Sequence, residues 1–247
     1  MSVSPDSRFF FIHIMKTAGA SFRQHAYANF RPGEVYPARE LDADLQLANW
    51  SISYVTNLPV ERRARTRVYT GHFPFATVEL MGLDLITLTI LRDPVDRTIS
   101  RLRQRQHYDD QSRSLRLEEI YEDPFFFPTH IHNHQAKIFA MTSQDRLESF
   151  MDVIDVDERR LGIAKSNLEQ VDVLGLQERF PEFLEEVEQR YGWHFRALRH
   201  GHGVPPATSE IPRSFRRRIS EDNAADVAFY EHACDLYHQR RRGRVHV

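Results

Sequence analysis

Three side chains in this sequence have the chemistry to bind an anion or move a proton: Lys16, His72 and Arg92. Lysine and arginine bind phosphate or sulfate groups, and a histidine accepts a proton near neutral pH. Each lies at or just after the end of a short apolar run that is typical of a buried strand. The three runs cover residues 9–14, 67–70 and 86–91.

The segment around Lys16 is rich in small residues. It reads HIMKTAGAS, residues 13–21, and its candidate anion-binding residues are Lys16, Thr17, Ala18, Gly19, Ala20 and Ser21. Small side chains let the backbone close around an anion, and the free N–H groups at a helix start point at it. The phosphate-loop pattern G-x-x-x-x-G-K-[ST] is absent, so an ordinary tight turn with a solvated lysine remains the alternative.

The segment ILRDPVDRTIS, residues 90–100, places Arg92 just after a strand and Ser100 nearly two turns into the next helix. The planar guanidinium of Arg92 can grip a phosphate, and the hydroxyl of Ser100 adds a donor. The alternative is a surface ion pair between Arg92 and Asp93 or Asp96.

His72 follows its strand in YTGHF, residues 69–73, and is suited to act as a general base. One histidine among 13 is weak evidence, because a lone histidine is more often a structural residue. The carboxyl ends of parallel strands share one edge of a sheet, where open α/β sheets bind ligands. Because Lys16, Arg92 and His72 all fall on that edge, the sequence favours a shared site.

The remaining elements predict one α/β domain over residues 1–247, with a mostly parallel sheet flanked by helices. A fourth strand is predicted over residues 171–174. Helices are predicted over residues 21–30, 94–106 (capped by Asp93), 159–169, 180–191 (closed by Gly192) and 223–238. Residues 196–218 are rich in glycine and proline and predict a long functional loop.

Composition argues against several other classes of protein. The net charge is −2, so no global field demands nucleic acid or a membrane surface. Only three of the 33 basic residues are lysines, which makes Lys16 notable. Cys234 is the only cysteine, which fits a reducing compartment, and neither a signal peptide nor a membrane span is recognisable. A cytoplasmic protein is therefore expected.

Two further clusters of residues each allow a structural and a functional interpretation. His130, His132 and His134 alternate as if on one strand face, but no carboxylate or cysteine joins them. A substrate-facing loop with Asn133 and Gln135 as hydroxyl partners is preferred to a metal site. A second cluster on one helical face is either solvated or in contact with an acidic glycan; it comprises Arg97, Arg101 and Arg105.

These segments resemble the 3′-phosphoadenosine-5′-phosphosulfate (PAPS)-dependent carbohydrate sulfotransferases, especially the heparan sulfate 2-O-sulfotransferase group. FFFIHIMKTAGASF is similar to the family's 5′-phosphosulfate loop, and ILRDPVDRTIS to its 3′-phosphate motif, with the same arginine-to-serine spacing. YTGHF resembles the segment that holds the catalytic base. VDVLGLQERFPEFLEEV and AADVAFYEHACDLY resemble a strand–helix segment and the last helix, so the likeness covers most of the chain.

The resemblance implies a three-layer P-loop NTPase-like fold and transfer of a sulfuryl group from PAPS to a hydroxyl, expected on a carbohydrate, with adenosine 3′,5′-bisphosphate (PAP) as product and no metal. His72 would be the base, Lys16 would neutralise the leaving group, and Arg92 and Ser100 would hold the 3′-phosphate. Arg199, in the long loop, would close over the nucleotide.

Two departures qualify the resemblance. Thr70 stands where better-studied members have a second histidine, so a role shared between two histidines is in doubt. Golgi members carry a membrane anchor and several cysteines, whereas no anchor is recognisable here and Cys234 is the only cysteine, which points to a bacterial-type cytosolic enzyme. Two rival functions stay open: a P-loop-like nucleotide kinase and a non-catalytic nucleotide- or glycan-binding relative.

Overall fold

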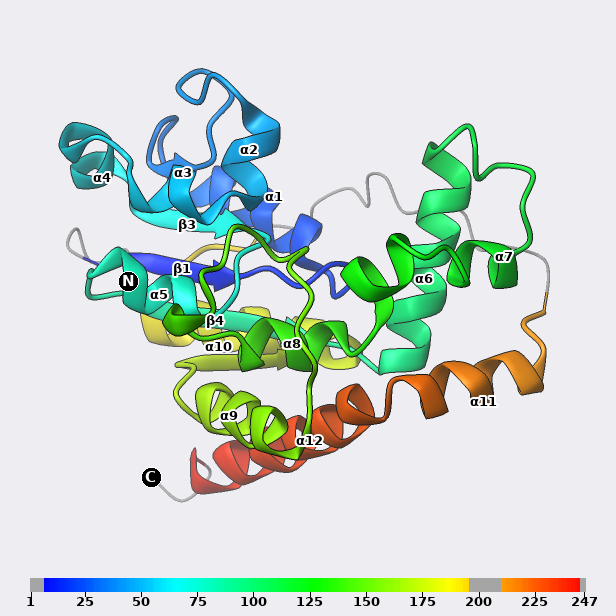
Figure 1. Ribbon diagram of the computed structural model, residues 1–247. Helices are drawn as coiled ribbons and strands as arrows, with labels where there is room; N and C mark the ends of the chain where they lie inside the picture. Colours follow the sequence, from blue (N-terminus) through cyan, green and yellow to red (C-terminus); the bar gives the residue numbers. More distant parts are fainter. Residues whose placement is uncertain (1–6, 196–209, 245–247) are drawn as a thin grey trace.

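Five short strands form one sheet in which every neighbouring pair is parallel (Figure 1). The computed structural model describes residues 7–195 and 210–244. Across the sheet the order is β2 (Val35–Tyr36), β3 (Val68–Gly71), β1 (Phe9–Ile12), β4 (Ile86–Leu91) and β5 (Val173–Leu176). The predicted parallel sheet is confirmed, and in the described part of the chain it is entirely parallel.

The central strand β1 shows why the strands read as continuous apolar runs. Phe9 and Phe11 point into one core cluster, while Phe10 and Ile12 point into another, because successive side chains alternate between the two faces. All four residues are fully buried. A parallel strand covered on both faces has no polar side, which is the pattern seen here.

Helices cover both faces of the sheet and give three layers. One face packs against α1 (Gly19–Asn29) and α10 (Phe180–Tyr191), with Trp193 filling the space beside them. The other face packs against α2 (Leu45–Trp50), α3 (Ile52–Thr56), α5 (Ala76–Met81), α8 (His134–Ala140), α9 (Glu158–Glu169) and α12 (Ala224–Arg244). No helix in the described part of the chain is long and apolar enough to cross a membrane.

A third, smaller core lies beyond the end of the sheet. It is built by α6 (Pro94–Tyr108), α7 (Leu117–Tyr121), the π-helix η1 (Phe127–Ile131) and α11 (Arg213–Asp222). The short elements α4 (Val60–Arg65), η2 (Ser143–Asp145) and η3 (Gln177–Arg179) complete the structure. Because α6 follows β4 directly, this third core lies next to the predicted site.

Several sequence predictions are confirmed at helix ends. The side chain of Asp93 accepts a hydrogen bond from the backbone N–H of Asp96 at 2.9 Å, and Pro94 occupies the first turn of α6. Gly192 ends α10 with a φ of 72°, a left-handed conformation that glycine adopts without strain.

Other predictions are wrong in part. Residues 213–218 belong to α11 rather than to a loop, because Phe215 and Ile219 pack into the third core. Residues 210–212 are outside any helix or strand, and the rest of that predicted loop, residues 196–209 with Arg199, lies outside the described residues. His130, His132 and His134 do not share a strand face, because the chain there forms η1 and then α8.

Candidate active site

The loops after β1 and β4 meet where the strand order reverses. From β1 the chain passes to β2 and β3 on one side of the sheet, then crosses to β4 and β5 on the other. Open parallel sheets bind ligands outside the carboxyl ends of their strands at such a reversal. Lys16 lies in the loop after β1, Arg92 directly follows β4, and His72 directly follows β3. The structure therefore places the three predicted residues at one edge of three adjacent strands.

The loop between β1 and α1 leaves the start of the helix uncapped. Lys16 and Ala18 have φ values of 70° and 71°, a left-handed conformation that is strained for residues other than glycine. Ala18 is the N-cap, and its carbonyl accepts the N–H groups of Ser21 and Phe22 at 3.0 and 3.2 Å. No side chain of the described residues caps α1. The first turn of α1 therefore has the free N–H groups and the positive end of a helix dipole that attract an anion.

Gly19 is required by the close approach of His13. A Cβ atom at position 19 would lie 2.0 Å from Cδ2 of His13, closer than any non-bonded contact allows. His13 is itself buried, and its ring centroid lies 4.3 Å from that of His72. The glycine thus lets helix α1 begin directly against the ring that packs on the predicted base.

His72 is held in one tautomer by its neighbours. Its Nδ1 atom lies 2.8 Å from the carbonyl oxygen of His13, so Nδ1 carries the proton and Nε2 is left with its lone pair. Its backbone N–H donates to the carbonyl of Asn49 at 2.7 Å. Burial is the main cause that lowers the pKa of His72 to about 4, and the charges of Arg23 and Arg101 lower it further. The hydrogen bond to the His13 carbonyl acts in the opposite direction and raises it. At neutral pH the ring is therefore uncharged and its Nε2 atom can accept a proton.

Arg92 ties the second loop to the first. Its Nη1 atom donates to the carbonyl oxygen of Lys16 at 3.3 Å. Its Nε atom is buried and has no hydrogen-bond partner among the described residues. A buried donor without a partner is unfavourable, and an anionic ligand would satisfy it.

Positive charge is concentrated around Lys16. Burial lowers the pKa of Lys16, and the charges of Arg101 and then Arg92 lower it further. Within residues 7–195 and 210–244, none of these three cations forms an ion pair with a carboxylate. Cations gathered in this way repel one another, and a bound anion relieves that repulsion.

The other predicted site residues take different places. Thr17 donates its hydroxyl to the carbonyl of Ile14 at 2.9 Å, so this donor holds the loop and is not free for a ligand. Ala20 and Ser21 are exposed on the first turn of α1. Ser100 is partly buried on the second turn of α6.

Gln135 and Asn133 do not have the role predicted for them. The Gln135 side chain is fully buried and bonded to the main chain of Arg92, and the Asn133 Oδ1 atom accepts the backbone N–H of Asp226. No group of three or more His, Cys, Asp or Glu side chains in the described residues is arranged to hold a metal.

The ring of Phe150 contacts three histidines that are distant from it in the sequence. Its ring centroid lies 5.6 Å from His72, 5.5 Å from His130 and 5.9 Å from His134. The pKa of His130 is lowered to about 2 by burial and by the nearby charges of Arg101 and other cations. Sequence reasoning missed Phe150 as a neighbour of His72, because nothing in the spacing of residues 72 and 150 indicates the contact.

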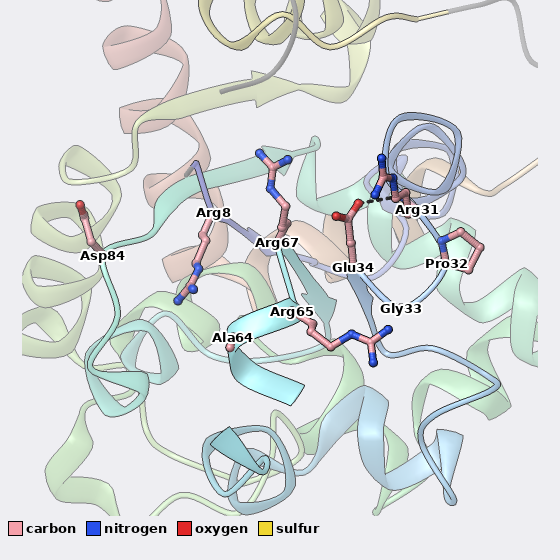
Figure 2. Close-up of a pocket in the computed structure, with 9 residues that line it drawn as sticks. All are labelled: Arg8, Arg31, Pro32, Gly33, Glu34, Ala64, Arg65, Arg67 and Asp84. Atoms are coloured by element: carbon pink, nitrogen blue, oxygen red, sulfur yellow. Dashed lines mark hydrogen bonds between the residues drawn. The ribbon is translucent and has the colours of Figure 1, made fainter. Parts of the chain in front are cut away.

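A second basic site lies at the opposite edge of the sheet (Figure 2). This arginine-lined cavity has a volume of about 640 Å³ and is bordered by Arg8, Arg31, Pro32, Gly33, Glu34, Ala64, Arg65, Arg67 and Asp84. Arg8 and Arg67 directly precede β1 and β3, whereas Lys16 and His72 come after them. The cavity is therefore separate from the candidate active site and provides an internal control for anion binding.

The comparisons with known proteins add no identification. No protein-family model matches the chain, and no curated protein matches its sequence. The class defined by fold and site is an α/β protein with a parallel sheet and a cationic, histidine-containing site at its carboxyl edge.

Proposed function

We propose that the chain is a PAPS-dependent sulfotransferase with a P-loop NTPase-like fold, acting on a hydroxyl of a carbohydrate or glycoconjugate. The observation that carries the proposal is the pairing of cations that have no ion-pair partner among the described residues with a neutral base. In the described part of the chain, Lys16, Arg92 and Arg101 lie together without a carboxylate partner, and His72 has an unprotonated Nε2 atom at the same edge. The resemblance of the loops after β1 and β4 to the sulfotransferase motifs supports the assignment of the donor.

In the proposed reaction, the acceptor oxygen attacks sulfur in line with the bond to the 5′-phosphate. His72 accepts the hydroxyl proton at Nε2 as the new S–O bond forms, while its Nδ1–H remains bonded to the His13 carbonyl. The bond between sulfur and the bridging oxygen breaks, and Lys16 neutralises the charge that develops on the departing bisphosphate. A general base is worth about 10²–10⁴-fold in rate, and the preorganised cations contribute electrostatic stabilisation.

The two ends of the nucleotide would be held by different elements. The uncapped first turn of α1 offers its N–H groups to the 5′-phosphate, and Arg92 with Ser100 would receive the 3′-phosphate. The unpartnered Nε atom of Arg92 is the donor that this phosphate would satisfy. A nucleotide without a 3′-phosphate should therefore bind less tightly than PAP.

The donor class is tested by measuring binding of PAP, adenosine 5′-phosphate and ATP with magnesium by calorimetry. We expect PAP to bind most tightly, and we expect Lys16→Ala and Arg92→Ala each to weaken it about 10- to 100-fold, the worth of a charged hydrogen bond. The matched control is Arg65→Ala in the arginine-lined cavity, which should leave PAP affinity unchanged. Preference for ATP would point to a kinase, and loss of binding in Arg65→Ala alone would move the nucleotide to the other cavity.

The transfer step is tested with labelled PAPS and a panel of hydroxyl acceptors that covers polysaccharides, glycolipids and small glycosides. We expect His72→Ala to keep its affinity for PAP and to lose at least about 100-fold in turnover, because only the general base is removed. Full activity in this variant would exclude His72 from the mechanism. Binding of PAP without transfer to any acceptor would favour the non-catalytic relative.

A further inference from the structure

The main chain of Arg92 is held from both sides by a single side chain. The Oε1 atom of Gln135 accepts the backbone N–H of Arg92 at 3.1 Å, and its Nε2 atom donates to the carbonyl oxygen of Arg92 at 2.8 Å. Gln135 is fully buried. Strand β4 ends at Leu91, so Arg92 would otherwise begin a turn without ladder partners. The side-chain amide of Gln135 therefore binds both the backbone N–H and the carbonyl of Arg92, as a neighbouring strand would.

Gln135 is in turn fixed at the start of α8. The carboxylate of Asp226, from α12, accepts the backbone N–H groups of Gln135 at 3.2 Å and Ala136 at 2.7 Å. Asn133 completes the arrangement, because its Oδ1 atom accepts the backbone N–H of Asp226 at 3.1 Å. The starts of α8 and α12 thus cap each other, and the position of Gln135 is set by two helices.

This chain of contacts determines where the Arg92 guanidinium can reach. The Arg92 side chain crosses to the carbonyl of Lys16, and its Nε atom is left without a partner among the described residues. If the peptide groups on both sides of Arg92 could rotate, the guanidinium would sample several directions. A ligand would then have to select one of them and lose affinity in proportion.

We propose that Gln135 is a positioning residue for anion recognition, which aims Arg92 at the 3′-phosphate of the nucleotide. The inference rests on the proposed function, since it takes the ligand of Arg92 to be that phosphate. Gln135 itself does not touch the nucleotide. Its effect should therefore be seen only with ligands that carry a 3′-phosphate.

The test compares two ligands and four variants. The affinity of PAP is divided by that of adenosine 5′-phosphate, which lacks the 3′-phosphate, for the wild type, Gln135→Met, Arg92→Ala and the double variant. Methionine keeps the volume of glutamine and removes both hydrogen bonds. We expect Gln135→Met to lower the ratio roughly tenfold, the scale on which misplacement of a binding group acts. The double variant should lower it no further than Arg92→Ala.

Asn167→Leu is the matched control. The Asn167 side chain, on α9, donates to the carbonyl of Phe139 at the other end of α8, at 2.8 Å, so its loss also frees a main-chain carbonyl, on the same helix that carries Gln135. The control should change stability but not the ratio. A wild type without preference for PAP would overturn both this inference and the proposed function. If the wild type prefers PAP and Gln135→Met has the same affinity ratio as the wild type, the inference alone is overturned.

Discussion

Lowering the pH from 7 to 5 should destabilise the folded chain, because four histidines are neutral in the native state. Burial is the largest cause that lowers the pKa of each; the four are His13, His72, His130 and His134. In the unfolded chain a histidine has a pKa of about 6.5. Below that pH the unfolded state binds protons that the native state does not, so the stability present at pH 7 is lost as the pH falls.

The size of the effect follows from the number of protons. Between pH 6 and 5 each of the four histidines is mostly protonated when unfolded and mostly neutral when folded, which gives roughly three to four protons. Asp226 acts in the opposite direction, because burial raises its pKa to about 6 and the native state then takes up a proton first. About three net protons remain from these five groups, which corresponds to a loss of about 4 kcal/mol over this one pH unit, and His25 and His132, whose pKa burial also lowers, act in the same direction.

Urea unfolding followed by circular dichroism at pH 7, 6, 5.5 and 5, at constant ionic strength, measures this slope. The His134→Phe variant should reduce it by about one proton, or about 1.4 kcal/mol per pH unit. His134 is a favourable position because it is 1% exposed, its Nδ1 atom has no partner among the described residues, and it packs edge-on against Phe150. A free energy of unfolding that is flat between pH 6 and 5 would refute the neutral histidine cluster. An unchanged slope in His134→Phe would remove His134 from it.

Two further changes test the geometry of the candidate site. Gly19→Ala should displace the His13 ring from helix α1, and we expect PAP affinity to fall about tenfold or more, measured by calorimetry; unchanged affinity would show that the loop accommodates the added methyl group. Arg101→Gln removes a positive charge, so the pKa of both Lys16 and His72 should rise, which histidine and lysine NMR titrations can follow. Static pKa values would place Arg101 too far from both groups to matter.

The sequence predicted the elements whose cause is local. The four longer strands lie in short runs dominated by apolar residues, and in Phe9–Ile12 every side chain is apolar, which is the pattern of a strand buried on both faces. Asp93 and Pro94 predicted the start of helix α6. The position of the candidate site followed from these elements alone, since the loops after parallel strands share one edge of the sheet.

The elements that were missed depend on distant partners. Strand β2 is only two residues long and exists because β3 supplies its ladder. The alternating histidines of residues 130–134 looked like a strand, but the carbonyls in this part of the chain are bound by two buried cations. Arg97 donates to His130 and Ile131, and Lys137 donates to Pro128 and Thr129. No local pattern specifies such contacts.

The same residue type therefore serves two purposes in this molecule, and hydrogen-bond partners distinguish them. Arg97 is fully buried, and both of its terminal nitrogens donate to main-chain carbonyls at the end of η1, where the helix dipole favours a cation. Arg92 lies at the carboxyl edge of the sheet, and among the described residues its guanidinium has a single carbonyl partner, that of Lys16; the Nε atoms of both arginines are buried without a partner there. The two terminal nitrogens of Arg97 are thus both bound by the fold, whereas the partly exposed guanidinium of Arg92 keeps donors for the anionic ligand proposed above.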